Sequence, residues 1–433
     1  MSLTVASPAA SVATRATLKW GIAFLISSAI AISYLDRQTL PWAIKAIQSE
    51  IPISNEIKAT LDSAFLLTYG LMYLGGGWLL DRLGTRRGFL LVMIFWSLAC
   101  ASHGFAGGVI ALAASRLLLG VGEGGGFPAA TRAIAEWFPV EQRATAMGIV
   151  NGGTAVGAVL APPLIALVLT HVHWLSLSSW RWVFFLTGAL GIIWAIAWWR
   201  TYFAPQDSGE PALQAEKPTV AISKLIRHRE IRGVVAAKFL SDAAWYFYLF
   251  WLPKYLFDAR GFDIKQAGSV GWIPYAASGV GSLCGGGFSS WLLARGRSVN
   301  LARKLALGAS AALMPWVILV PHVPSVAWVI IIFSIAFFGQ QSWSTLVMIL
   351  PTDLVPREAL GTVAGLVGFG GAMGGVLLGQ LAGWLLDHGF SYTPVLAIAG
   401  SMHILAFGII CLAIPTIHLL NVGNGNKTRE PHD

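Results

Sequence analysis

The chain has 433 residues, of which 56% are hydrophobic and 11% are charged, and its mean hydropathy is +0.67. A soluble domain of this length buries a core with far less apolar sequence, so the composition excludes an ordinary soluble protein. The net charge of +9 needs no nucleic-acid partner, because the basic residues lie mainly in short connections rather than in one basic domain. Cys100, Cys284 and Cys411 are scattered through apolar segments, which predicts neither a disulfide framework nor a metal site.

Twelve long apolar segments follow one another along the chain. About 20 apolar residues cross a hydrocarbon layer of ~30 Å. In lipid only helices and closed barrels satisfy their own backbone, and barrel strands alternate in polarity, whereas these segments are continuously apolar. The sequence therefore predicts an all-α membrane protein with twelve transmembrane helices. The predicted helices cover residues 18–44, 57–80, 88–107, 109–131, 143–169, 181–200, 234–257, 266–293, 302–320, 325–349, 359–386 and 392–416.

Several of these segments contain charged residues that a lipid-facing helix would not carry. Asp36 and Arg37 lie in the first, Arg116 and Glu123 in the fourth, and Asp242 in the seventh. An ionisable group at membrane depth is costly and by default marks a substrate or ion pathway. The pattern favours a polytopic transporter. The first segment is too long for the core of a signal peptide, so we expect it to remain uncleaved.

The connection after the second segment carries a specific motif. It reads Gly77-Trp-Leu-Leu-Asp81-Arg82-Leu-Gly84-Thr-Arg86-Arg87. This resembles the signature of the major facilitator superfamily. We expect the acid at this helix end to accept hydrogen bonds across the seam between the two halves and so to hold one mouth of the transporter shut. The corresponding loop of the second half, around Arg295 and Arg297, keeps glycines and basic residues but lacks the acid, so this gating motif belongs mostly to the first half.

One long polar connection, residues 201–233, divides the chain into residues 1–200 and 234–433, each with six predicted helices. The two halves are related, because shifting residues 122–160 forward by 217 aligns identical residues without a gap. Examples are Pro139 with Pro356, Gly153 with Gly370 and Gly157 with Gly374. An even number of helices per half makes the repeats parallel, which is the arrangement of transporters whose two bundles rock about a central site.

Lys and Arg residues predict the orientation. On the side of both termini we count 20 of the 29, against 6 on the other side, with 3 inside the predicted helices. Because cytoplasmic loops carry the excess of basic residues, both termini are expected in the cytoplasm.

Two buried arginines of the first half are predicted at compatible depths in the membrane. Arg116 and Glu123 are two turns apart on one helix face, ~10 Å and ~21 Å from residue 109 at 1.5 Å per residue. Arg37 lies ~26 Å along its helix from Trp20, a depth compatible with Arg116. Two guanidinium groups at one level suit bidentate recognition of a carboxylate. Two structural alternatives stay open: Asp36 and Arg37 as a pair snorkelling to a helix end, and Arg116 with Glu123 as a structural ion pair.

The second half offers polar and aromatic candidates for a hydroxyl-rich ligand. Asp242 could instead pair with Lys238 one turn away. His171 and His173 lie in a loop without acids and are expected to be solvated. The remaining candidates, together with one from the fifth helix, are Trp245, Tyr246, Gln340, Gln341, Trp343 and Asn151.

Over residues 18–416 the chain resembles the anion:cation symporter family, and within it the bacterial hexuronate and aldonate transporters. The motifs that carry the resemblance are Tyr34-Leu-Asp36-Arg37, Ser115-Arg116 through Glu123 to Pro128, Glu136-Trp-Phe-Pro139 and Lys238 through Asp242 to Lys254. The resemblance implies that Arg37 and Arg116 hold a substrate carboxylate while Asp36 and Glu123 exchange protons. It also places Tyr69 near the substrate, and puts Thr154 where some relatives carry Gln.

The sequence thus predicts a proton-coupled symporter that imports a hexuronate or aldonate across the bacterial inner membrane. It is not an enzyme and needs no cofactor beyond the proton. The expected partners are a small organic anion and membrane lipid, and we expect a monomer. An organic-anion antiporter of the same fold and a sugar-acid sensor that does not transport remain the alternatives.

Overall fold

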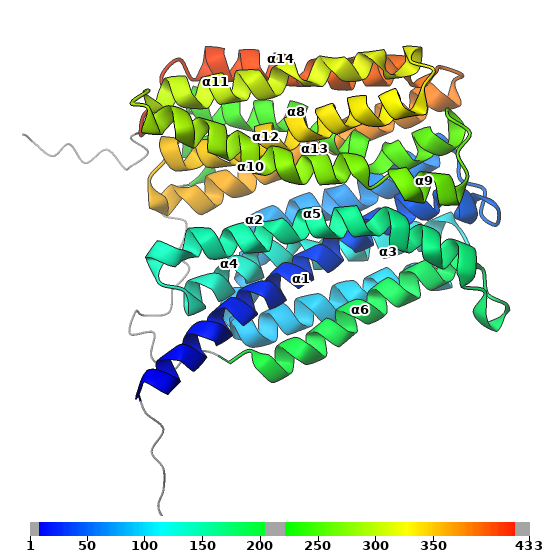
Figure 1. Cartoon of the computed structure of the whole chain (residues 1–433), viewed down its shortest axis with the longest axis horizontal. Helices are drawn as coiled ribbons and strands as arrows, with labels where there is room; N and C mark the ends of the chain where they lie inside the picture. The colour runs from blue at the N-terminus through cyan, green and yellow to red at the C-terminus, as the bar shows by residue number, and fades with distance from the viewer. Residues whose placement is uncertain (1–7, 204–220, 421–433) are drawn as a thin grey trace, which may run out of the picture.

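A computed structural model describes the backbone of residues 8–203 and 221–420, and the side chains in these ranges except residues 8–17, 76–79, 81, 140, 141, 144 and 357. The described chain is helical and contains no strand, which confirms the predicted fold class. Figure 1 shows two layers of long helices, one from each half of the sequence, lying side by side. Most of the predicted connection 201–233 lies outside the described residues.

Two glycines shape the helices of the first half. The chain breaks at Gly84, where φ is 70°, a conformation that only glycine adopts freely, so α2 crosses the molecule twice. α3 and α4 meet at Gly125 and together form the fourth predicted crossing. The elements are α1 (Pro8–Gln48), α2 (Asn55–Ser102), η1 (His103–Phe105), α3 (Val109–Gly124), α4 (Gly126–Trp137), α5 (Val140–His171), η2 (Trp174–Ser176) and α6 (Ser179–Thr201).

The second half repeats this order with different breaks. α9 and α10 together form the eighth predicted crossing, while α11 passes into the 3₁₀ helix η3, which contains Pro315 and Pro321. Proline has no backbone N–H to donate, so the regular hydrogen bonds of an α-helix do not continue through this segment. The elements are α7 (Ile222–Leu225), α8 (Arg229–Asp258), α9 (Ile264–Val270), α10 (Ile273–Ala294), α11 (Val299–Ala312), η3 (Met314–His322), α12 (Val326–Leu354), α13 (Arg357–Asp387) and α14 (Tyr392–Ala413).

Nine stretches of the described chain are long and apolar enough to cross a membrane. The other three predicted crossings are the first limb of α2, the charged helix α8 and the broken pair α9–α10. α8 is long enough to cross a membrane, but charged residues along its length, among them Lys238, Asp242 and Lys254, lower its mean hydropathy. These three segments nevertheless run alongside the others in the two layers (Figure 1).

Glycines at repeat-related positions pack equivalent helices together. A Cβ atom at Gly157 of α5 would collide with the backbone carbonyl of Ala31 in α1. A Cβ atom at Gly374 of α13, 217 residues later, would collide with the carbonyl of Phe239 in α8. Small residues allow such close backbone approach between membrane helices. The internal repeat read from the sequence therefore corresponds to a repeated helix crossing.

We call the end of the molecule where α1 begins and α14 finishes the terminal end, and the opposite end the far end. The halves are tied together toward the far end. Asp387 of α13 accepts hydrogen bonds from the backbone N–H groups of Asn55 and Glu56 at 3.0 and 2.8 Å. Deeper in the seam, the hydroxyl of Tyr275 donates to the side-chain carbonyl of Gln38 at 2.9 Å. The hydrogen bonds between described residues of the two halves thus hold the halves together toward the far end.

Replacing Gly157 by Ala should destabilise the protein, because the added methyl meets the Ala31 carbonyl and forces α1 away from α5. We expect the free energy of unfolding to fall by about 1–3 kcal/mol, the range for overpacked cores. Gly152→Ala is the matched control on the same helix, since its Cβ would meet open space. Thermal unfolding in detergent measures both, and an equal midpoint for the two variants would contradict the assigned crossing.

Candidate functional site

A buried ion pair joins α1 to α3 in the first half. Arg37 donates from Nη2 and Nε to Oε2 of Glu123 at 2.8 and 3.2 Å. The hydroxyl of Ser33, one turn before Arg37, donates to the same oxygen at 2.8 Å. Arg37 and Glu123 are each 2% exposed. The carboxylate is therefore held by a charged and a neutral donor inside the bundle, and its other oxygen has no hydrogen-bond partner among the described residues.

Aromatic rings surround the guanidinium of Arg37. Its central carbon lies 4.6 Å from the ring centre of Tyr34, 4.5 Å from that of Tyr69 and 5.3 Å from that of Phe65. Cations are attracted to aromatic faces at such distances, more strongly where water is excluded. The rings hold the guanidinium in place without a second anion. An incoming carboxylate would therefore meet a cation that is already oriented.

Arg116 of α3 is the second buried guanidinium. It is 0% exposed, and none of its three side-chain nitrogens has a hydrogen-bond partner among the described residues. Its central carbon lies 5.8 Å from the ring centre of Phe65, so this one ring is shared by Arg116 and Arg37. A buried cation without a bound counter-ion is costly. The arrangement is suited to a ligand that brings an anionic group.

Asp36 points away from Arg37, its neighbour in the chain. It is 0% exposed, and neither carboxylate oxygen has a hydrogen-bond partner among the described residues. Cys100 and Thr187 lie beside it, and they contact each other at 3.3 Å between Sγ and Oγ1. Asp36 and Arg37 are therefore both inside the bundle, and the alternative of a pair snorkelling to a helix end is wrong. Arg116 and Glu123 do not form an ion pair either, because Glu123 pairs with Arg37.

Aromatic contacts connect this site to the second half. The ring centre of Phe65 lies 6.3 Å from that of Phe250 in α8, and Phe250 stacks on Tyr246 at 5.8 Å. Tyr69 shares a hydrogen bond with Tyr73 at 3.1 Å between the hydroxyl oxygens. We call Arg37, Phe65, Tyr69, Tyr246 and Phe250 the seam cluster. It links the ion pair of the first half to α8 of the second.

Other predicted binding residues lie elsewhere. The side-chain oxygen of Gln340 accepts a hydrogen bond from Nε2 of His403 in α14, and the ring centre of Trp343 lies 5.5 Å from that of the same histidine. Both side chains thus face a helix of their own half. Gln341, the next residue, is only partly buried. The described contacts do not connect these three residues with Arg37.

The predicted residues of α5 are more exposed than those of α1 and α3. Asn151 is exposed, and the hydroxyl of Thr154 donates to the Asn151 carbonyl at 2.7 Å. The next residue, Ala155, lies beside Gly279 of α10, at the seam between the halves. Asn151 and Thr154 are therefore near the seam, but within the described part of the chain no hydrogen bond or ion pair joins them to Arg37 or Glu123.

Some site residues were not predicted. Ser33 and Phe65 lie one turn before Arg37 and Tyr69, so helical spacing is the signal that could have found them. A third buried pair, Lys58 with Asp62 in α2, also was not predicted, and the Lys58 ammonium lies 4.2 Å from the ring centre of Trp251 across the seam. The predicted alternative for Asp242 is confirmed, because it accepts from Lys238 at 2.9 Å.

The gating motif is described only in part. The side chains of Gly77 and Asp81 lie outside the described residues, so the expected latch across the seam stays a prediction. Gly84 forms the sharp turn, and Arg86 donates to the backbone carbonyl of Trp199 at 2.6 Å. Thr85 donates to Glu136, which also accepts from Tyr202 and Arg132. These contacts tie α2, α4 and α6 together within the first half.

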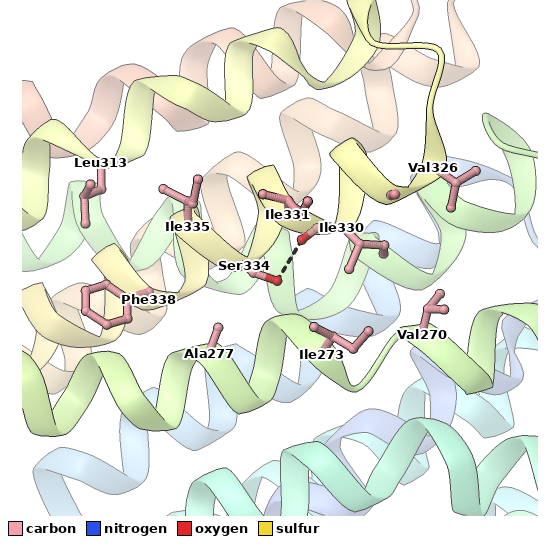
Figure 2. Close-up of a pocket in the computed structure, with 11 residues that line it drawn as sticks. Val270, Ile273, Ala277, Leu313, Val326, Ile330, Ile331, Ser334, Ile335 and Phe338 are labelled. Atoms are coloured by element: carbon pink, nitrogen blue, oxygen red, sulfur yellow. Dashed lines mark hydrogen bonds between the residues drawn. The ribbon is translucent and has the colours of Figure 1, made fainter.

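A large groove of ~840 Å³ lies away from the charged residues. Figure 2 shows its apolar lining from α9, α10 and α12, including Ile273, Ile331 and Phe338, and from Leu313 between α11 and η3. Its one hydroxyl, that of Ser334, donates to the Ile330 carbonyl at 2.7 Å. With no charged side chain in the lining, this groove suits lipid chains and not a small organic anion.

Comparisons with known proteins agree with this arrangement. A sequence model of the Major Facilitator Superfamily matches residues 26–379. The D-galactonate transporter of Escherichia coli is 29% identical over 395 residues, covering 86% of this chain and 90% of that protein. The hexuronate transporter of Escherichia coli is 28% identical over 412 residues, covering 91% and 93%. The galacturonate transporter of Dickeya chrysanthemi is 30% identical over 315 residues, covering 69% and 89%.

Solved structures show the same fold. A crystal structure of a bacterial homolog to the human lysosomal transporter Spinster, in an inward-facing and unoccupied conformation, superposes with a TM-score of 0.70. The alignment covers 92% of this chain and 96% of that chain at 18% sequence identity. At this identity the likeness concerns the fold alone.

Glu123→Ala should destabilise the protein strongly, because Arg37 then stays buried without its counter-ion. Removing one partner of a buried ion pair costs about 3–5 kcal/mol of the free energy of unfolding. Glu56→Ala is the control, since the Glu56 side chain is 47% exposed and its contact with Nδ1 of His388 is long, at 3.8 Å. Thermal unfolding at constant detergent concentration compares the two variants. A similar fall in the unfolding midpoint of both would show that the pair of Arg37 and Glu123 does not stabilise the protein more than a surface contact does.

Proposed function

Because the chain belongs to the Major Facilitator Superfamily, we propose that it is a proton-coupled symporter that imports a sugar acid by alternating access. The superfamily consists of transporters and not of enzymes, and the protein is a multi-pass membrane protein. The names of its relatives, which are galactonate, hexuronate and galacturonate transporters, support a sugar acid as the substrate. The proton is the only additional ion that the proposal requires.

The observation that carries this proposal is the guanidinium of Arg116, which has no hydrogen-bond partner in the described part of the chain and, like the paired guanidinium of Arg37, is buried in the first half. Both lie against the ring of Phe65. A sugar-acid carboxylate placed between them accepts planar, bidentate hydrogen bonds from each. The hydroxyl groups of the sugar then meet the tyrosines of the seam cluster. A neutral sugar offers no group that would compensate the buried charge of Arg116.

Coupling to protons follows from competition for Arg37. A substrate carboxylate that binds Arg37 displaces Glu123, which then lies buried without its cationic partner. A buried carboxylate in that position is neutralised by a proton, since isolated charge at low dielectric is strongly disfavoured. Substrate and proton therefore bind cooperatively, and each favours the binding of the other. Asp36, enclosed next to this site, is the second candidate for carrying a proton.

We propose that the protein lies in the bacterial inner membrane with both termini in the cytoplasm. The excess of basic residues at the terminal end supports this orientation. The far end, closed by Asp387 against the start of α2, then faces the periplasm. Import requires that this contact opens and that the two halves rock about the seam cluster. We expect a monomer to be sufficient, because each chain contains both halves.

Hexuronates or aldonates should bind, and the parent neutral sugars should not, because only an acid supplies the anion for Arg37 and Arg116. The measurement is counterflow of labelled galacturonate in proteoliposomes, with unlabelled glucuronate, galactonate, glucose and galactose as competitors. The acids are expected to compete and the neutral sugars to leave the uptake unchanged. If glucose competes as well as glucuronate, the carboxylate site is wrong.

Glu123→Gln should retain substrate exchange but lose uphill accumulation. The amide still accepts a hydrogen bond from Ser33 or Arg37, yet it cannot gain and lose a proton. Counterflow should therefore continue, while a pH gradient should no longer drive accumulation above the equilibrium level. Glu56→Gln, near the far end, serves as the control that retains both. Undiminished accumulation by Glu123→Gln would exclude Glu123 as the obligatory coupling acid.

A further inference from the structure

A buried ion pair lies on the first limb of α2, between the far end and the seam cluster. The ammonium of Lys58 donates to Oδ2 of Asp62 at 2.5 Å, and both side chains are buried. The other carboxylate oxygen, Oδ1, is buried and has no hydrogen-bond partner within the described ranges. Asp62 can therefore accept a hydrogen bond from a further donor.

The same stretch of α2 runs along the part of α3 that carries Arg116. The hydroxyl of Thr68 donates to the carbonyl of Leu117 at 2.9 Å, and the ring centre of Phe65 lies 5.8 Å from the guanidinium carbon of Arg116. Asp62 is one turn before Phe65, and of the described charged side chains it exerts the strongest electrostatic influence on Arg116. The carboxylate that bonds to the ammonium is thus also the electrostatic neighbour of this guanidinium.

Lys58 reaches the second half of the protein. Its ammonium lies 4.2 Å from the ring centre of Trp251 in α8. Cations are attracted to aromatic faces, and most strongly to that of tryptophan. One residue after Asp62, the hydroxyl of Ser63 accepts a hydrogen bond from the amide of Gln380 in α13 at 3.0 Å. The ion pair therefore lies where α2 is held to both α8 and α13, so the charge on the ammonium bears on the closure of the far end.

We propose that Asp62 is an exchangeable counter-ion, which pairs with Arg116 in the substrate-free transporter and with Lys58 when a substrate carboxylate occupies Arg116. This inference rests on the proposed function and deepens it, because it gives Arg116 a carboxylate of its own, as Glu123 is the partner of Arg37. A substrate carboxylate that binds the guanidinium releases Asp62 to the ammonium, which then lies against the ring in α8.

The exchange links occupancy of the site to the state of the far end. When Asp62 pairs with Arg116, the ammonium of Lys58 has no anion, and an uncompensated buried cation is costly. Water that enters through an open far end relieves this cost, so the substrate-free protein favours the open state. Once a substrate carboxylate compensates Arg116, Asp62 returns to Lys58, and the dry contact with Trp251 becomes favourable. An acid therefore favours closure of the far end, and a neutral sugar does not.

The test is equilibrium binding to the purified protein of labelled galacturonate, glucuronate or galactonate, whichever binds most tightly. In Lys58→Gln, Asp62 has lost its other cation and competes for Arg116, so the Kd should rise by about tenfold. In the double variant Lys58→Gln/Asp62→Asn the competitor is absent, so the Kd should return to that of the parent or below it. Lys254→Gln is the matched control, since its partner Asp258, one turn away on α8, is 44% exposed and becomes solvated. Its Kd should equal that of the parent.

Thermal unfolding without substrate gives a second readout. Lys58→Gln leaves Asp62 with Arg116 as its counter-ion, whereas Asp62→Asn leaves two buried cations without one. The unfolding midpoint should therefore fall much further in Asp62→Asn than in Lys58→Gln, and failure of Asp62→Asn alone to fold is the extreme of this result. Equal losses would show an ordinary structural pair and would overturn the exchange.

The binding outcomes separate this inference from the proposed function. If Lys58→Gln binds as well as the parent, or if the double variant binds as weakly as Lys58→Gln, the exchange is refuted and the proposed function stands. An equal rise of the Kd in Lys254→Gln would attribute the loss to the overall positive potential of the region, which also refutes the exchange. If the parent binds none of the three acids, the proposed function fails and the exchange falls with it.

Discussion

The structure depends on one constraint, which is that a charge enclosed in a membrane protein must be compensated from within. Arg37 and Glu123 meet this constraint by pairing across two helices, so the pair also fixes the position of α1 relative to α3. Three aromatic rings complete the enclosure of Arg37. Arg116 and Asp36 are the exceptions, since each is enclosed without a hydrogen-bond partner among the described residues. A cation left in this way can bind an anionic group, and a carboxylate left in this way can bind a proton.

Close helix packing keeps these charges away from lipid and water. Glycines such as Gly157 and Gly374 let the backbones of neighbouring helices touch, and they do so at positions related by the internal repeat. Each half can then behave as a rigid bundle with its own ion pair inside. Motion between the halves consequently falls on the seam, where aromatic side chains such as Phe65 and Phe250 meet at their edges. Glycines also bring α13 close to α2 across the seam, since a Cβ atom at Gly365 or Gly383 would meet the backbone carbonyl of Tyr73 or Asn55, so these contacts must separate when the halves move apart.

The sequence was sufficient to predict much of the fold and the identity of the buried charges. Long apolar segments require helices in lipid, and charges within them stand out because lipid does not tolerate them. The sequence could not tell which way a side chain on a helix faces when every face is apolar. Gln340, a predicted ligand contact, lies 217 residues after Glu123 and so at the equivalent position of the internal repeat, yet it contacts His403 within its own half. The shared register gives equivalent backbone positions, but the neighbouring helix α14 supplies a polar partner that determines the orientation of the side chain.

The two halves, although related by the repeat, use different kinds of ion pair. In the first half Arg37 and Glu123 come from different helices, so a ligand that separates them changes a contact between α1 and α3. In the second half Lys238 and Asp242 lie one turn apart on α8, so the pair itself joins no two helices, although Lys238 also donates to Ser344 of α12. Separation of the first pair can therefore change the position of α1 relative to α3 directly. This difference is the reason that we propose proton coupling for the first half.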